Sequence, residues 1–333
     1  MNATERLNNY LEGKPVDRTP NLNIVMQFAA KHAGVPYGVY CTDHRYLVDA
    51  NIKCCRDFGI DMVSAISDPF RETAGFGANV VINEDDVPSC QEHLIQNYGD
   101  IKKLSVKDPC KETRMADRIA AIERYKQMCG DEYPIMGWVE GAFAEANDLR
   151  GISNLMCDIF DEPEFVGELV EICLEQALCF ADAQVSAGAQ FIGIGDAVAS
   201  LVGPELFCQY VLPAEQKLIA GIHRLGARVK LHICGNTTAL LPFFSETGAD
   251  IIDIDHVVDL AQAIESVGTN QFVCGNFDPV SVLLRGTPVD VCEAVTQCLS
   301  VGKEQLIISA GCEVPKFTPV ENLMAVNEAF FRG

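Results

Sequence analysis

The sequence predicts a single (β/α)8 barrel, an α/β fold in which parallel strands close on themselves and helices cover the outside. Short apolar runs of strand type recur along the chain, and amphipathic stretches of helix length separate most of them. Strand and helix alternate about eight times, which is typical of a parallel sheet. The 333 residues suit one such barrel, so we expect one domain over 1–333.

The apolar runs give the expected strands, which are 21–25, 62–66, 134–139, 190–194, 228–233, 251–254, 271–274 and 305–309. The later runs are separated by expected helices over 164–186, 204–225, 238–247 and 289–300. Several helices end at a glycine before the next strand, as at Gly188, Gly226 and Gly248, which is a common helix stop. An open doubly wound sheet is the alternative, but no Gly-x-Gly-x-x-Gly follows the first strand.

Two regions exceed a minimal barrel. Residues 1–19 are expected to form a short helical extension. Residues 67–133 are too long for one crossover, so we expect an insertion between the second and third strands. Within it, 79–83 and 92–95 are expected to pair as a small hairpin over the barrel, followed by a helix over 115–128.

Charge and composition narrow the function. Lys and Arg number 25 against 47 Asp and Glu, which gives a formal charge of −22. A chain this acidic repels phosphate backbones, so no nucleic-acid partner is expected. The longest stretch without Asp, Glu, Lys or Arg, 231–245, is too short to span a bilayer. The first residues are polar and lack a secretory signal pattern, so we expect no membrane association and a cytoplasmic location.

Cysteine is unusually frequent, with 15 residues scattered mostly in apolar runs. Without an export signal these are expected to be reduced thiols, most of them packed as small apolar side chains. Cys54 and Cys55 lie in an expected helix, where adjacent residues point in different directions, so both are interpreted as core residues.

One histidine and two cysteines stand apart because they lie at or just after the ends of strands, where barrel enzymes place their chemistry. His232 and Cys234 are two residues apart, so an extended chain presents both on one face. Cys312 follows the last strand. One imidazole and two thiolates are ligands that Zn²⁺ prefers, and three protein ligands leave an open position, as in catalytic zinc sites. A packed histidine with free thiols is the alternative.

Carboxylates follow three other strands. Glu140, after the third strand, is a candidate fourth zinc ligand. Asp196, after the fourth strand, is a candidate catalytic residue that could orient His232, or else a helix cap. Asp255, after the sixth strand, is a candidate contact for the metal surroundings or the substrate.

The chain resembles the uroporphyrinogen decarboxylase superfamily. The segment GKPVDRTP at 13–20 is similar to that superfamily's sequence just before the barrel. Three later segments resemble its methylcobamide:coenzyme M methyltransferase branch: LHICGNT at 231–237, GNFDPV at 275–280 and AGCEVP at 310–315. The similarity extends over essentially the whole chain and is strongest from about residue 190 onward.

The resemblance implies a zinc-dependent methyltransferase. In that branch the zinc ligands are a His-x-Cys pair and a later Cys, which match His232, Cys234 and Cys312. It implies Zn²⁺ as cofactor, a methylated corrinoid protein as donor and a small-molecule thiol acceptor such as coenzyme M. Another thiol and tetrahydrofolate are alternative acceptors. Asn236 and Asn276, together with Asp255, are then candidates for binding the corrinoid cofactor.

Two rival functions remain at this stage. The decarboxylases grip substrate carboxylates with arginines after the first strand, whereas 26–32 here has none, and few Lys or Arg are expected near the mouth. Asp68 does resemble the decarboxylases' catalytic aspartate; we interpret it as a feature of the mouth that faces corrin or substrate, or as a helix cap. The other rival is a non-catalytic corrinoid-binding barrel.

Overall fold

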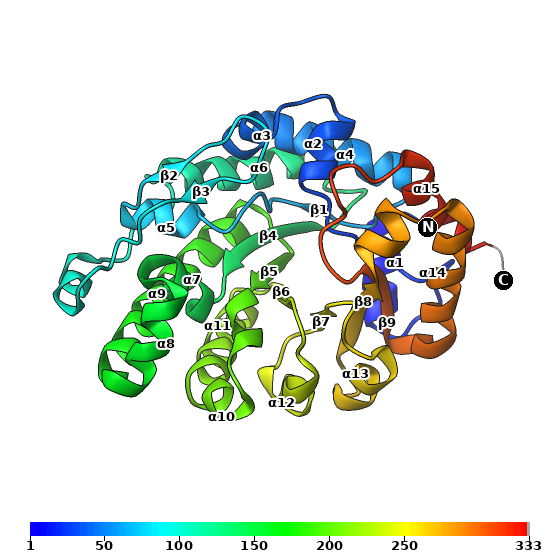
Figure 1. Ribbon diagram of the computed structural model, residues 1–333. Helices are drawn as coiled ribbons and strands as arrows, with labels where there is room; N and C mark the ends of the chain where they lie inside the picture. Colours follow the sequence, from blue (N-terminus) through cyan, green and yellow to red (C-terminus); the bar gives the residue numbers. More distant parts are fainter. Residues whose placement is uncertain (332–333) are drawn as a thin grey trace.

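The structure, a computed structural model, describes residues 1–331 and shows a curled parallel sheet with helices outside it (Figure 1). Its seven strands lie in the order β1-β4-β5-β6-β7-β8-β9, and every neighbouring pair is parallel. The strands are β1 Val63–Ser64, β4 Ile135–Glu140, β5 Phe191–Gly195, β6 Arg228–Ile233, β7 Ile251–Ile254, β8 Phe272–Phe277 and β9 Leu306–Ala310.

The segment 20–25 closes the barrel between β9 and β1. Leu22 N donates to Ile308 O at 2.8 Å, and on the other side Asp61 N donates to Asn21 O at 2.8 Å. The expected strand over 21–25 is nevertheless wrong as a regular strand, because only Asn21 and Ile308 form a ladder bridge. The reason is that the Asn23 side chain, not its backbone, accepts from Ala310 N at 2.8 Å. The closure favours the barrel over an open sheet.

Helices cover the outside of the barrel where the amphipathic pattern predicts them. Among the expected stretches, 204–225 is divided by a π-helical turn, η3 Phe207–Val211. Gly248 ends α12 with φ +84°, a left-handed conformation that costs glycine little. The barrel helices are α4 His44–Phe58, α6 Thr113–Cys129, α7 Ala142–Arg150, α8 Ile152–Asp161, α9 Pro163–Ala187, α10 Pro204–Leu206, α11 Leu212–Arg224, α12 Leu241–Thr247, α13 Leu260–Ser266, α14 Pro288–Gly302 and α15 Val320–Ala329.

The N-terminal extension and the insertion are present. The extension is α1 Ala3–Leu11, which begins at a capping box formed by Asn2 and Glu5. Two short helices, α2 Gln27–His32 and α3 Tyr37–Thr42, come before β1 in the chain, and a third, α5 Arg71–Phe76, comes after it.

The hairpin of the insertion pairs β2 Val80–Val81 with β3 Ser89–Cys90. The sequence placed the second strand at 92–95, which is wrong. The turn is tighter than expected because the Asn83 side chain donates to Val87 O at 2.6 Å. Ile95 instead pairs its amide with Leu149 O of α7 at 2.9 Å and is buried there. The stretch then continues into η1 Tyr98–Lys103 before the long helix α6.

The apolar core has two parts. The larger part lies between the sheet and the outer helices, and it contains Cys54 and Cys55, as the sequence predicts. The smaller part fills the barrel interior with side chains such as Met136, Trp138 and Phe272. None of the 15 cysteines, all within the described residues, forms a disulfide. Among residues 1–331, no helix has the length and apolarity needed to cross a bilayer.

Candidate active site

The centre of the candidate site is His232, which lies near the end of β6 and is 8% exposed. Asp253 of β7 lies beside it in the sheet register, and Asp253 Oδ2 is 3.0 Å from His232 Nδ1. Burial raises the pKa of Asp253, but Lys230 and His232 outweigh burial and lower it, so the side chain is a carboxylate. A carboxylate only accepts hydrogen bonds, so Nδ1 donates to Asp253, and Nε2 is the ring nitrogen left for other partners.

The expectation that Asp196 orients the imidazole is therefore corrected: Asp253 has that role. Asp196 touches the strand through its backbone, since its amide donates to His232 O at 3.0 Å. Its carboxylate is 1% exposed and faces the start of α7. Burial is the main cause that raises its pKa to about 7, against the lowering effect of nearby backbone amides. A catalytic role for Asp196 stays a prediction.

The two predicted thiol ligands lie at the same imidazole. Burial lowers the pKa of His232, but the charge and hydrogen bond of Asp253 and hydrogen bonds with the Cys234 and Cys312 thiols outweigh it and raise that pKa well above its usual value. Both cysteines are partly exposed at the mouth. As they stand, no three His, Cys, Asp or Glu side chains in the described part of the chain form a group that could hold a metal ion. The residues meet, but they do not form a closed coordination shell.

Asp255 ties the loop after β7 to the loop that carries Cys234. Its Oδ2 accepts from the amide of Gly235 at 2.9 Å, where the backbone has φ +90°. Gly311, next to Cys312, packs so tightly on the His256 backbone that a side chain there would collide with it. The loop after β7 therefore contacts both cysteine-bearing loops.

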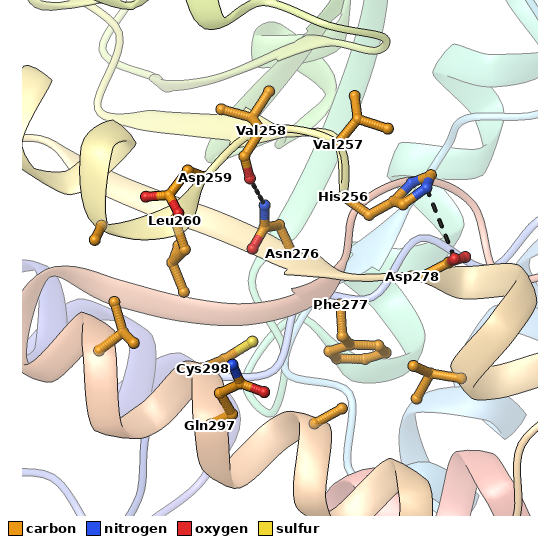
Figure 2. Close-up of a pocket in the computed structure, with 14 residues that line it drawn as sticks. His256, Val257, Val258, Asp259, Leu260, Asn276, Phe277, Asp278, Gln297 and Cys298 are labelled. Atoms are coloured by element: carbon orange, nitrogen blue, oxygen red, sulfur yellow. Dashed lines mark hydrogen bonds and ion pairs between the residues drawn. The ribbon is translucent and has the colours of Figure 1, made fainter.

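The two predicted cofactor-binding asparagines have different surroundings. Asn276 lies at the end of β8, and its Nδ2 donates to Asp255 O at 3.0 Å and to Val258 O at 2.6 Å, the latter drawn in Figure 2. It therefore holds the loop after β7 in place. Asn236 is exposed, and its side chain accepts from Thr238 N at 3.1 Å. A role of either residue in binding a cofactor stays a prediction.

A pocket of about 510 Å³ adjoins this loop (Figure 2). Apolar side chains such as Val258, Leu260 and Phe277 line much of it, and His256 lies at its rim with Nε2 3.8 Å from Asp278 Oδ2. Asn276 forms part of its wall. The pocket thus shares the loop after β7 with the site but holds none of the predicted zinc ligands.

The other predicted residues of the mouth form a separate ionic cluster. Asp68 accepts two hydrogen bonds from Arg114, with Oδ1 at 2.8 Å and Oδ2 at 2.7 Å, and also caps the chain at Phe70 N. Burial raises the pKa of Asp68, but the arginine charges outweigh it and bring that pKa to about 2. Glu140 accepts from Arg71 at 2.6 Å and from Trp138 Nε1 at 3.1 Å.

These contacts correct one expectation. Glu140 is held by Arg71, so the structure gives it another partner and does not bring it to the predicted zinc ligands. Three basic side chains, Arg71, Arg114 and Lys230, pair with carboxylates of this region. Sequence reasoning missed these three and Asp253. For Lys230 and Asp253 a signal was available, because each is a charged residue within an apolar strand, in the segments KLHI and IIDI.

Comparison with known proteins places this barrel in a family. The family model for uroporphyrinogen decarboxylase (URO-D) matches residues 2–332. The chain belongs to the uroporphyrinogen decarboxylase family. This URO-D family chain is 32% identical over 333 residues to the methylcobamide:CoM methyltransferase MtbA of Methanosarcina acetivorans, a match that covers 97% of the chain and 96% of that protein.

Two further similar proteins are a decarboxylase and a methyltransferase of known structure. A uroporphyrinogen decarboxylase of Carboxydothermus hydrogenoformans is 26% identical, over 85% of this chain and 81% of that protein. The solved structure of a methyltransferase from Methanosarcina mazei superposes with a TM-score of 0.91 at 23% identity, covering 99% of this chain and 98% of that one. The family resemblance and the barrel fold predicted from the sequence are both confirmed.

Proposed function

We propose that this protein is a zinc-dependent methyltransferase that moves a methyl group from a methylated corrinoid, carried by a partner protein, to a thiol. The observation that supports it most is that Cys234, just after β6, and Cys312, just after β9, both lie at the imidazole of His232 near the end of β6. The full-length similarity to a methylcobamide:CoM methyltransferase supports the same reaction class.

The donor set fits Zn²⁺ by its chemistry. One neutral imidazole and two thiolates are soft to borderline ligands, and three of them leave one position for a substrate. Asp253 gives His232 the tautomer that such a site needs, because it holds Nδ1–H and leaves Nε2 free. When bound, Zn²⁺ lowers the pKa of a thiol at the open position, so that the thiol is present as the thiolate.

The chain's own residues account for the rest of the mechanism. His232 and the two cysteines would hold the zinc ion at the mouth, so that a thiol bound at its open position would lie there, and Asp253 keeps the imidazole from turning. The thiolate sulfur attacks the methyl carbon, so an S–C bond forms as the Co–C bond breaks and the electron pair stays with the corrinoid. Positioning of the two reactants in line is the main contribution that the mouth can make.

The decarboxylase alternative is weaker because its key residue is engaged elsewhere. Asp68 is buried, and Arg114 binds both of its carboxylate oxygens. A carboxylate held in this way caps and anchors a loop, and it has no free oxygen to face a pyrrole. A non-catalytic corrinoid-binding barrel would not explain why two thiols lie at the His232 imidazole.

The acceptor is proposed to be coenzyme M or another small thiol, and tetrahydrofolate is the acceptor that the experiment should exclude. The test incubates the zinc-loaded protein anaerobically with methylcobalamin and each acceptor in turn, and follows loss of the methylcobalamin spectrum. Methylation of a thiol that stops on zinc removal and returns on zinc addition supports the proposal. Equal turnover with and without zinc, or turnover with tetrahydrofolate alone, contradicts it.

A further inference from the structure

Lys230 is a fully buried lysine inside the barrel, with 0% of its side chain exposed. Lysine is almost never fully buried unless it is paired. Its partner is Asp253, whose Oδ2 the ammonium contacts directly. Lys230 lies on β6 two residues before His232, so alternation along the strand places both side chains on the same face.

Asp253 is thus held from two sides by residues of a single strand. Its Oδ2 accepts from both Lys230 and His232, while Oδ1 has no hydrogen-bond partner in the described structure. Without the lysine ammonium, Oδ2 would keep the imidazole as its hydrogen-bond partner, and the neutral Cys274 thiol would be the other group beside the carboxylate. A carboxylate that has lost its ammonium partner is held less firmly, and the ring that it binds can turn with it.

We propose that Lys230 is a positioning residue for the metal centre: it fixes the Asp253 carboxylate, and Asp253 in turn fixes the His232 ring so that Nε2 faces Cys234 and Cys312. This inference rests on the proposed zinc function. The competing interpretation is a buried ion pair that only stabilises the barrel. The two differ in what they predict for metal affinity in a folded variant.

The test compares Lys230→Met with a matched buried ion pair outside the barrel. Arg150 of α7 bonds Asp158 at 2.7 Å, and their side chains are 8% and 3% exposed. Arg150→Met therefore removes a buried cation of similar environment that has no contact with the site. For both variants, Zn²⁺ affinity is measured by chelator competition, the Co²⁺-substituted protein by its visible absorption, and stability by urea unfolding.

A positioning role predicts that Lys230→Met weakens Zn²⁺ binding by about 10- to 100-fold and shifts the Co²⁺ absorption, as loss of other outer supports does. Arg150→Met should keep the Zn²⁺ affinity within about twofold of the wild type and leave the Co²⁺ absorption unchanged, however much it destabilises the fold. Zn²⁺ affinity and a Co²⁺ spectrum that stay unchanged in folded Lys230→Met would overturn the proposal.

A second variant keeps the test decisive if Lys230→Met does not fold. Lys230→Met combined with Asp253→Asn removes both charges, so neither is left unpaired, and the Asn oxygen still accepts from His232. The same loss of Zn²⁺ affinity is expected, and wild-type affinity in this variant would overturn the proposal. Failure of the wild type itself to bind Zn²⁺ would instead contradict the proposed function, so the two failures are distinguishable.

Discussion

Asp253 lies directly across from His232 in the register of β6 and β7, and its Oδ2 accepts the Nδ1 proton at 3.0 Å. This pair decides which imidazole nitrogen is available. Because Asp253 is ionised, Nδ1 must donate to it, so Nε2 is the nitrogen left to meet the two thiols. Histidines that ligate metals commonly have such a carboxylate on the other nitrogen.

Loss of either thiol should remove the metal while the fold remains. We expect Cys234→Ala and Cys312→Ala to lower zinc content from about one per chain to near zero, because three ligands leave no redundancy. Both residues lie at the mouth and are partly exposed, so urea unfolding should change little. Metal analysis by mass spectrometry checks this, with the exposed Cys157→Ala as the control that keeps its zinc.

His232→Ala should lose zinc in the same way. The lost ring also leaves Lys230 as the main partner of the Asp253 carboxylate. Retention of one zinc per chain by His232→Ala together with either cysteine variant would mean that the ion is bound by other residues.

We expect this protein to recognise the protein that carries the methylated corrinoid, and not the corrinoid alone. In the proposed reaction the cobalt must reach the mouth, and Phe317, which follows β9, is an aromatic side chain that is 65% exposed. We expect transfer from a methylated corrinoid protein to be faster than from free methylcobalamin at equal concentration, through a small transient interface. Equal rates would indicate that no partner is recognised.

Phe317→Ser should slow only the reaction with the protein donor, by about fivefold to tenfold, because exposed aromatic side chains often anchor interfaces. Met128→Ser is the matched control. Met128 is also exposed, at 46%, but it lies at the end of α6, which precedes the opposite end of the barrel strands. An equal effect of Phe317→Ser on free methylcobalamin would contradict a docking role.

The ion pair between Asp68 and Arg114 should contribute to stability in a pH-dependent manner. The pKa of Asp68 is lowered to about 2, against about 3.9 in an unfolded chain. A lowered pKa stabilises the fold above pH 4, and that contribution is lost as the pH falls through about 2. This contribution is about 3 kcal/mol. Urea unfolding between pH 7 and pH 2.5 should show a smaller decline for Asp68→Asn than for the wild type, and parallel curves would contradict this.

Glu215 should have the opposite effect. It is 1% exposed on α11, and neither carboxylate oxygen has a hydrogen-bond partner in the described structure. Burial, with Asp196 nearby, raises its pKa well above the usual value. A raised carboxyl pKa destabilises the fold increasingly as the pH rises above about 4.3, the value in an unfolded chain. Glu215→Gln should therefore be more stable than the wild type at pH 8, by a margin that shrinks toward pH 5.

Much of the fold could be predicted because it depends on local patterns. Apolar runs and glycine stops located the strands from β4 onward, with ends that differ by a few residues, as in β8, which continues to Phe277. The first strand failed because Asn21 and Asn23 replace part of the backbone pairing with side-chain hydrogen bonds. The second strand of the hairpin was misplaced because the apolar residue Ile95 does not belong to a strand. It bonds to α7, which is remote in sequence.

The site was predictable only in part, for a similar reason. His232, Cys234 and Cys312 lie at or just after strand ends, and strand ends meet at one face whatever their separation in sequence. Side-chain partners across strands depend on register, which the pattern of apolar residues does not give. Glu140 was therefore assigned to the metal when its partner is Arg71, and Asp196 was assigned to His232 in place of Asp253.

The most direct test of the whole account is methyl transfer by the variant in which His232, Cys234 and Cys312 are all replaced by Ala. Wild type and variant, each supplied with Zn²⁺ and matched for circular dichroism, are mixed anaerobically with methylcobalamin and coenzyme M while the corrinoid spectrum is recorded. We expect formation of cob(I)alamin by the wild type and a rate at least about 100-fold lower for the variant. A variant that transfers methyl groups at the wild-type rate would contradict the zinc–thiolate mechanism.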